Sequence, residues 1–226
     1  DMVDAMNFKS FRIWISFNDL FMVDENDDIE FNMRYLGIMR GYVDKLVNAG
    51  VEQFLMLCST YLYPIDYVPS DLFVVPHPEE EYEDYIRFLN LQAKAYKKLV
   101  QEFPMLNNLE PGNEPDLNGV CIHKNGFTFG GSSAINAEYK YTDEEQTKII
   151  ADLCWYVRRA VKEVDPNARV VLPALTNFEY TPDYLELIYK GIESKKLPAG
   201  QTFSDVNPDN YFDILNWHSF KYRRRY

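Results

Sequence analysis

Short apolar runs alternate along this chain with longer stretches in which apolar residues recur every three or four positions. The short runs have the length and continuous hydrophobicity of strands covered on both faces. The longer stretches have the period of amphipathic helices. We therefore predict strands at 11–17, 51–58, 103–109, 168–174 and 211–218, and helices at 31–49, 80–103, 142–164 and from 181 onward.

Residues that start or stop helices fall at the ends of these stretches. Gly50 follows the first predicted helix and Pro104 follows the second. Thr142, followed three positions later by Glu145, forms a capping box for the third. Pro182 stands at the first position of the fourth, where proline is tolerated best. These start and stop signals place the helix ends where the hydrophobic pattern places them.

Strict alternation of strands and helices predicts a parallel sheet with right-handed crossovers. We find no linker, internal repeat or low-complexity tract, so we predict one α/β domain over 1–226. An open doubly wound sheet and part of a (β/α)8 TIM barrel both fit about five βα units. No glycine-rich phosphate loop follows the first strand. Polar or charged residues instead recur at every strand end, as at the active end of a barrel, and these are Arg12, Asn18, Ser59, Tyr61, Asn113, Glu114, Asn177, Glu179 and His218.

Charge and composition narrow the classes of partner. Asp and Glu number 35 against 23 Lys and Arg, and the net charge of −12 excludes nucleic acid as a favourable partner. No run approaches the roughly 20 apolar residues of a membrane span. The three cysteines lack metal or redox spacing and are expected to be buried free thiols. The chain opens on acidic residues without a signal peptide, and the sequence leaves localisation and oligomeric state open.

The segment with the clearest chemistry is 109–115, which reads Leu-Glu-Pro-Gly-Asn-Glu-Pro at the end of the third predicted strand. An apolar strand that delivers one carboxylate to its carboxyl end, beside an amide, is how α/β barrels present a general acid/base. Prolines flank the Asn113–Glu114 pair closely. The long stretch 115–142 follows directly, and loops of that length in compact domains are usually functional or disordered.

The Gly112–Asn113–Glu114–Pro115 motif resembles the one that clan A glycoside hydrolases carry at the end of strand 4 of their (β/α)8 barrels. The resemblance implies a retaining glycosidase in which Glu114 is the general acid/base and Asn113 binds the sugar 2-hydroxyl. Arg12 resembles the arginine common near strand 2, and His218 resembles the histidine near strand 6, with Phe220 in place of a tyrosine. Families 39, which is xylosidase-like, and 5 look most similar.

If the Asn-Glu strand is strand 4, the visible strands are the second to the sixth, and strands 1, 7 and 8 are missing. The catalytic nucleophile of the clan, a second Glu at the end of strand 7, would then lie outside this sequence. A full barrel takes about 250 residues. We therefore expect an incomplete barrel that is inactive alone, acting in its complete form on an oligo- or polysaccharide.

Five aromatic or basic side chains complete the candidate substrate site. His218 and Arg12 are expected to contact substrate, Trp217 and Trp14 to stack against a sugar ring, and Tyr61 to form a subsite wall, although strand tryptophans are as often core residues. Glu179 is a weaker candidate for a second carboxylate. The acidic run 24–28 lacks the glycine and terminal glutamate of a calcium loop, and no metal or other cofactor is implied.

Two other functions stay open at the level of sequence. One is a carbohydrate-binding barrel that has lost catalysis, because such a protein would also lack the nucleophile. The other is an open-sheet α/β protein with a metal or phosphate site, which metal-dependent thermal stabilisation would distinguish.

Overall fold

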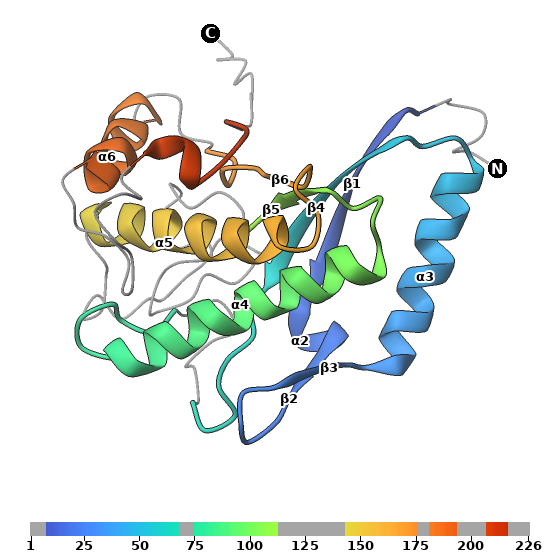
Figure 1. Ribbon diagram of the computed structural model, residues 1–226, viewed down its shortest axis with the longest axis horizontal. Coiled ribbons are helices and arrows are strands. Elements are labelled where there is room, and N and C mark those ends of the chain that lie inside the picture. The colour runs from blue at the N-terminus through green and yellow to red at the C-terminus, as the bar shows by residue number, and fades with distance from the viewer. Residues whose placement is uncertain (1–7, 68–74, 113–142, 176–180, 194–206, 217–226) are drawn as a thin grey trace, which may run out of the picture.

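A parallel sheet with helices packed on one of its faces makes up the centre of the molecule (Figure 1). This computed structural model describes residues 8–67, 75–112, 143–175, 181–193 and 207–216. Within these residues the sheet has four strands, β1 (Ser10–Ser16), β4 (Gln53–Thr60), β5 (Asn108–Glu110) and β6 (Arg169–Val170). All of the pairings between them are parallel, as the alternating pattern predicted.

The spatial order of the strands is β1-β4-β5-β6, the same as their order along the chain. A parallel bridge between Val171 and Ile214 then places the segment around Ile214 beside β6, as the next neighbour in sequence. A doubly wound sheet reverses its strand order partway, whereas a barrel adds each strand beside the previous one. The order observed here is that of a barrel wall.

Four long helices follow the strands: α3 (Met33–Asn48), α4 (Tyr82–Glu102), α5 (Asp143–Lys162) and α6 (Thr181–Glu193). Each is amphipathic, and α4 and α5 lie across the same face of the sheet in Figure 1. The side chain of Asn32 accepts a hydrogen bond from the backbone N–H of Arg34 and caps α3. Gly50 follows α3 with a φ of 84°, the left-handed conformation that glycine adopts without strain. The predicted helices are confirmed, with ends displaced by a few residues.

The two faces of the sheet differ sharply in composition. The outer face, which α4 and α5 cover, carries the alternate residues Ile13 and Ile15 of β1, and Phe54 and Met56 of β4, all buried in the main core. The inner face is the opposite one and carries the intervening residues, including Arg12 and Trp14 of β1. Alternation along each strand therefore sends apolar side chains to the helices, while the inner face mixes polar side chains such as Arg12 with apolar ones such as Trp14.

A small hairpin near the carboxyl end of β1 was not predicted. A short helix, α2 (Phe17–Leu20), leads into the antiparallel pair β2 (Phe21–Val23) and β3 (Ile29–Phe31). The acidic run 24–28 is its turn, in which the Asp24 side chain accepts the N–H groups of Asn26 and Asp28. The Arg87 guanidinium of α4 binds Asp27 at 2.7 Å and fixes the hairpin to the helix layer.

Three predicted strands are shorter than expected. The run 103–109 contributes only Asn108 and Leu109 to the sheet, where β5 extends one residue further, because Phe103 caps α4 and the following residues form a turn. Of the predicted strand 168–174, only Arg169–Val170 forms β6. In the predicted strand 211–218, the described residues make one isolated bridge after a 3-10 helix, η3 (Pro208–Asn210), and residues 217–218 lie outside the described ranges. The Asp213 side chain accepts the N–H of Val170, a side-chain contact that replaces part of a regular backbone ladder.

Buried residues between the sheet and the helices account for most of the core, and several predictions for single residues are confirmed there. Trp155 on α5 is 4% exposed, as expected for a core tryptophan, with the Arg159 guanidinium over its ring. Cys58 and Cys154 are buried free thiols, while Cys121 falls outside the described ranges. Across the described part of the chain, no helix is long and apolar enough to cross a membrane.

Candidate functional site

The carboxylate of Glu110, the last residue of β5, lies at the centre of the inner face and is fully buried. Its Oε2 atom accepts hydrogen bonds from Nη2 of Arg12 at 2.8 Å and from Nε at 3.2 Å. This is a charge-assisted contact of two nitrogens with one oxygen, among the stronger hydrogen-bond types in proteins. The pair joins β1 to β5 across the intervening strand β4.

The second oxygen of Glu110 binds the other side of the sheet. Oε1 accepts the backbone N–H of Ala174 at 2.8 Å, just beyond β6, and the side-chain amide of Asn216 at 3.2 Å, just beyond the bridge at Ile214. One carboxylate therefore connects β1, β5 and two segments that follow β6 in space. Sequence analysis did not single out Glu110, although it lies within the motif segment 109–115.

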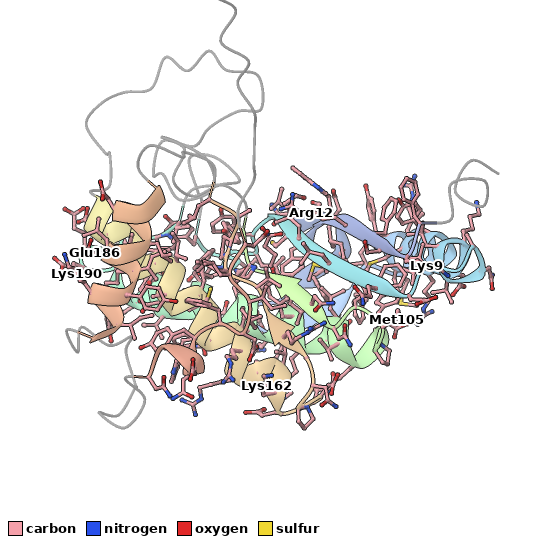
Figure 2. The ribbon with its side chains drawn as sticks, turned by 90° about the horizontal axis from the view of Figure 1, so that it is seen from above. Lys9, Arg12, Met105, Lys162, Glu186 and Lys190 are labelled. Carbon is pink, nitrogen blue, oxygen red and sulfur yellow. The ribbon has the colours of Figure 1, made fainter. Side chains whose placement is uncertain are left out.

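Arg12 reaches this carboxylate from the middle of β1, not from the strand's carboxyl end. It is the third residue of the strand and pairs in register with Leu55, whereas Trp14 stands level with Leu57 and hence with Glu110. Its grouping with strand-end residues was therefore wrong, because β1 extends to Ser16. Figure 2 shows Arg12 on the side of the sheet away from Lys162, the last residue of α5.

Glu110 and Gly112 form a tight turn just before the Asn113–Glu114 pair in the sequence. The carbonyl oxygen of Glu110 accepts the N–H of Gly112 at 3.0 Å and the hydroxyl of Tyr96, from α4, at 2.9 Å. Gly112 has a φ of 127°, and a Cβ atom there would lie 2.7 Å from the Tyr61 hydroxyl oxygen. Both the backbone conformation and the space beside Tyr61 thus require glycine at this position.

The other predicted site residues divide into two groups. Trp14 and Tyr61 lie within the described residues, as Arg12 does. Trp14 is on the inner face with 48% of its surface exposed, beside the Arg12 guanidinium. Tyr61 is 2% exposed, with its ring edge-on to Phe88 and its hydroxyl beside Gly112. The second group lies outside the described ranges and consists of Asn113, Glu114, Glu179, Trp217 and His218.

A groove with a volume of about 400 Å³ lies on the inner face beside Arg12, at the amino-terminal ends of the strands, because the first residue of each strand (Ser10, Gln53, Asn108 and Arg169) lines it. Its lining includes Asn108 from β5, Arg169 from β6 and Asn216. The side-chain amide of Asn108 donates to the backbone carbonyl of Phe54 at 2.9 Å, which bridges β5 to β4 at the floor of the groove. Guanidinium and amide groups in a concave surface can donate and accept several hydrogen bonds at once, which suits a polyhydroxylated ligand.

The negative charge at Glu110 influences its buried neighbours. Burial raises the pKa of the Cys154 thiol, and the Glu110 carboxylate raises it further. Burial also raises the pKa of the Tyr96 hydroxyl, with Glu110 among the contributing charges. Both groups therefore stay protonated near neutral pH, and Tyr96 stays a hydrogen-bond donor to the Glu110 carbonyl.

A second polar cluster lies between α4 and α5. The Asp152 carboxylate, 1% exposed, accepts the Tyr85 hydroxyl at 2.6 Å and pairs with Lys148 at 2.5 Å. Burial raises the pKa of Asp152, and Lys148 opposes that rise. Nearby, Nε2 of His77 lies 3.1 Å from the Glu145 carboxylate. The two residues are 68 positions apart along the chain, so a local sequence pattern does not reveal this pair.

Metal binding finds no support in the described ranges, where no three His, Cys, Asp or Glu side chains are arranged to hold an ion. The two arginines near the groove and the donors around Glu110 favour acceptor-rich organic groups over cations. Candidate chemistry around Glu110, at the carboxyl end of β5 and just before the Gly-Asn-Glu-Pro segment, is therefore hydrogen bonding, while the groove lies toward the amino-terminal ends of the strands.

Comparison with known proteins gives matches at the level of structure. No family model and no curated protein sequence matches the chain. An exo-β-1,4-mannosidase from Opitutaceae bacterium strain TAV5 matches 96% of this chain at 13% identity with a TM-score of 0.53. A β-glucosidase from Thermotoga maritima, solved with castanospermine, matches the same share at 10% identity with a TM-score of 0.56.

The chain spans 33% of the mannosidase and 51% of the β-glucosidase chain. Likeness at such low identity carries information about the fold alone. The strand order, the parallel register and these matches agree that the chain has the α/β fold of part of a (β/α)8 barrel.

Proposed function

We propose that this chain forms the part of a glycoside hydrolase barrel that holds the general acid/base, Glu114, and the sugar-binding Asn113. One observation carries the proposal: β5 ends at Glu110 on the carboxyl edge of a barrel-type sheet, four residues before Glu114. Active sites of these barrels lie at that edge. The likeness of the fold to a mannosidase and a β-glucosidase supports the same conclusion.

The proposed reaction is retaining hydrolysis of a β-glycosidic bond in an oligo- or polysaccharide. Retaining enzymes hold two carboxyl groups roughly 5–5.5 Å apart, one as acid/base and one as nucleophile. Glu114 donates its proton to the leaving oxygen, and a nucleophile supplied by a later strand, outside this chain, attacks the anomeric carbon. The charge of that nucleophile raises the pKa of the acid and keeps it protonated until it is needed.

Other predicted residues take supporting roles in this proposal. Arg12 and Trp14 lie on the inner face, where a sugar ring can stack on the exposed indole. His218 and Trp217 follow Asn216, whose amide binds Glu110, so we propose that both contact substrate. Tyr61 contributes a hydroxyl beside Gly112, where it limits the space at the turn that precedes Asn113.

Leaving-group dependence tests the role of Glu114. In a polypeptide that contains this chain and cleaves β-glycosides, Glu114→Ala should slow substrates with poor leaving groups by about 10²–10⁴-fold, the usual contribution of a general acid. Activated aryl glycosides need little protonation and should be affected much less at the glycosylation step. Equal loss on both substrates would contradict the acid/base role.

Ligand-induced stabilisation tests the sugar site in the 226-residue chain itself. We expect β-1,4-linked disaccharides or deoxynojirimycin to raise its unfolding temperature, since a ligand that binds only the folded state stabilises it. Binding without turnover in the complete protein would identify a non-catalytic carbohydrate-binding barrel. Stabilisation by divalent metal or phosphate, with no effect of sugars, would instead support the open-sheet alternative.

A further inference from the structure

The buried carboxylate of Glu110 is not one of the two catalytic groups of the proposed reaction, yet it has more cross-sheet contacts than a simple ion pair needs. Its donors come from Arg12, 98 residues earlier, and from Ala174 and Asn216, 64 and 106 residues later. An uncompensated buried charge is strongly destabilising, so Glu110 and Arg12 depend on one another. The additional contacts to Ala174 and Asn216 need a separate explanation.

All four of these contacts reach Glu110 as donors: two guanidinium nitrogens on Oε2, and a backbone N–H and an amide nitrogen on Oε1. An ionised carboxylate accepts on both oxygens and donates from neither. A glutamine of the same shape would have to turn its NH₂ group toward one of the two sets of donors. The two sets of donors therefore require a carboxylate at this position, and a side chain that only matches its shape does not satisfy them.

The segments held in this way continue toward the proposed sugar site at the carboxyl edge. The Arg12 guanidinium lies beside the ring of Trp14, which stands level with Glu110, and Asn216 directly precedes Trp217 and His218. The backbone of Glu110 is itself held by the Tyr96 hydroxyl from the helix layer. The carboxylate is thus anchored on one side and binds the groove residues on the other.

We infer that Glu110 is a positioning residue, which fixes Arg12, Ala174 and Asn216 relative to β5 and thereby sets the affinity of the proposed site for sugar. This inference rests on the proposed function for its last step. Misplacement of binding groups by about 1 Å can lower activity by as much as about 10²-fold, so a positioning role has a measurable consequence.

The central experiment compares Glu110→Gln with a matched control, Glu102→Gln. Glu102 also binds an arginine, Arg40, at 2.6 Å, but on the helical surface and away from the groove. Hydrogen exchange of the Ala174 amide and of the Arg12 Nε–H group, measured by NMR, reports the positioning contacts without any sugar. We expect exchange at both sites to be about tenfold or more faster in Glu110→Gln, from the loss of charge-assisted hydrogen bonds, and unchanged in Glu102→Gln.

Sugar affinity is measured on the same proteins with the disaccharide or deoxynojirimycin that stabilises the wild type. We expect Glu110→Gln to weaken binding about tenfold or more. A second control, Leu99→Ala, removes a buried side chain of α4 away from the groove and lowers stability by cavity formation. It should lower the unfolding temperature without changing the dissociation constant, which separates positioning from general destabilisation.

The outcomes of this experiment distinguish the two proposals. Unchanged exchange at Ala174 and Arg12 in Glu110→Gln overturns the positioning role, as does a Glu110→Gln dissociation constant equal to that of Leu99→Ala. Failure of the wild type to bind any sugar contradicts the proposed function, while the exchange result still decides whether Glu110 holds the two segments. If Glu110→Gln does not fold, Glu110→Asp replaces it, because it keeps the charge but cannot reach both sets of donors. The positioning role then requires that hydrogen exchange at the Ala174 amide or the Arg12 Nε–H group is accelerated in Glu110→Asp by the same factor.

Discussion

The outer and inner faces of the sheet are formed by the same strands, but different interactions hold their side chains in place. On the outer face, Phe54 and Met56 pack under the helices and are buried by apolar contact alone. On the inner face, Arg12, Asn108 and Glu110 are held by specific hydrogen bonds between strands. Apolar packing tolerates exchange of one hydrophobic residue for another, whereas a buried polar network needs each partner in place. The outer face thus stabilises the fold, and the inner face fixes the geometry of the candidate site.

The largest expected effect is a difference in the free energy of unfolding between substitutions at two adjacent residues of β4, one on each face of the sheet. Phe54 is 1% exposed on the outer face, and Phe54→Ala should lower the free energy of unfolding by about 3–5 kcal/mol through loss of burial and formation of a cavity. Leu55 lies on the inner face beside the groove, and Leu55→Ala should lower it by roughly 1 kcal/mol. Urea denaturation of both variants gives the two values. Equal losses would mean that the inner face is as tightly packed as the core.

A smaller effect is expected at the turn beyond β5, where the site meets the helix layer. Gly112→Ala should lower the free energy of unfolding by about 1–3 kcal/mol, because an L-residue is strained at a φ of 127°. The new Cβ would also contact the Tyr61 hydroxyl. Tyr61→Phe in the same chain should therefore restore part of the loss, beyond what Tyr61→Phe does alone. Strict additivity of the two substitutions in denaturation experiments would rule out the steric contribution.

The smallest effect concerns the buried polar cluster of the helix layer and depends on pH. Burial raises the pKa of Asp152 above its usual value near 3.8, so the folded chain binds a proton there more readily than the unfolded chain does. The stability that this protonation adds is complete below the unfolded pKa and is lost as pH rises through the folded pKa. The unfolding temperature of the wild type relative to Asp152→Asn should accordingly fall from about pH 4 upward.

The control for this pH series is Glu52→Gln, which makes the same change of net charge at an exposed carboxyl paired with Lys9. A flat difference between wild type and Asp152→Asn across the acid range would show that Lys148 and Tyr85 fully compensate the buried charge. That result would make the helix-layer cluster resemble the inner face, where donors surround the carboxylate of Glu110.

Elements with a strong local pattern were predicted well. The helices α3, α4 and α5 repeat apolar residues at helical spacing and have start or stop signals, and their boundaries agree within a few residues. Strands β1 and β4 were found with an offset of one or two residues. The hairpin β2–β3 was missed because its strands have three residues each, too few to show a period.

Predictions for the site depended on how far apart the partners are in the sequence. The position of the Gly-Asn-Glu-Pro segment beyond a strand end was predicted, because the strand and the motif are contiguous; the roles of Asn113, Glu114 and His218 stay predictions. Arg12 was proposed by resemblance, and its partner Glu110 was not foreseen. A signal did exist, since a carboxylate between Leu109 and Pro111 at the end of a buried strand requires a cation or several donors.

The sequence by itself determined where the long helices lie, where the strands begin along the chain to within a few residues, and the parallel α/β class. These properties follow from helical periodicity and from short continuous apolar runs, which are local and can be read in a short window. Tertiary structure alone decided that one carboxylate joins Arg12, Ala174 and Asn216 across the inner face. The order and register of the strands determine which distant residues come into contact. On a face where the contacts are between polar side chains, no local sequence pattern specifies that register.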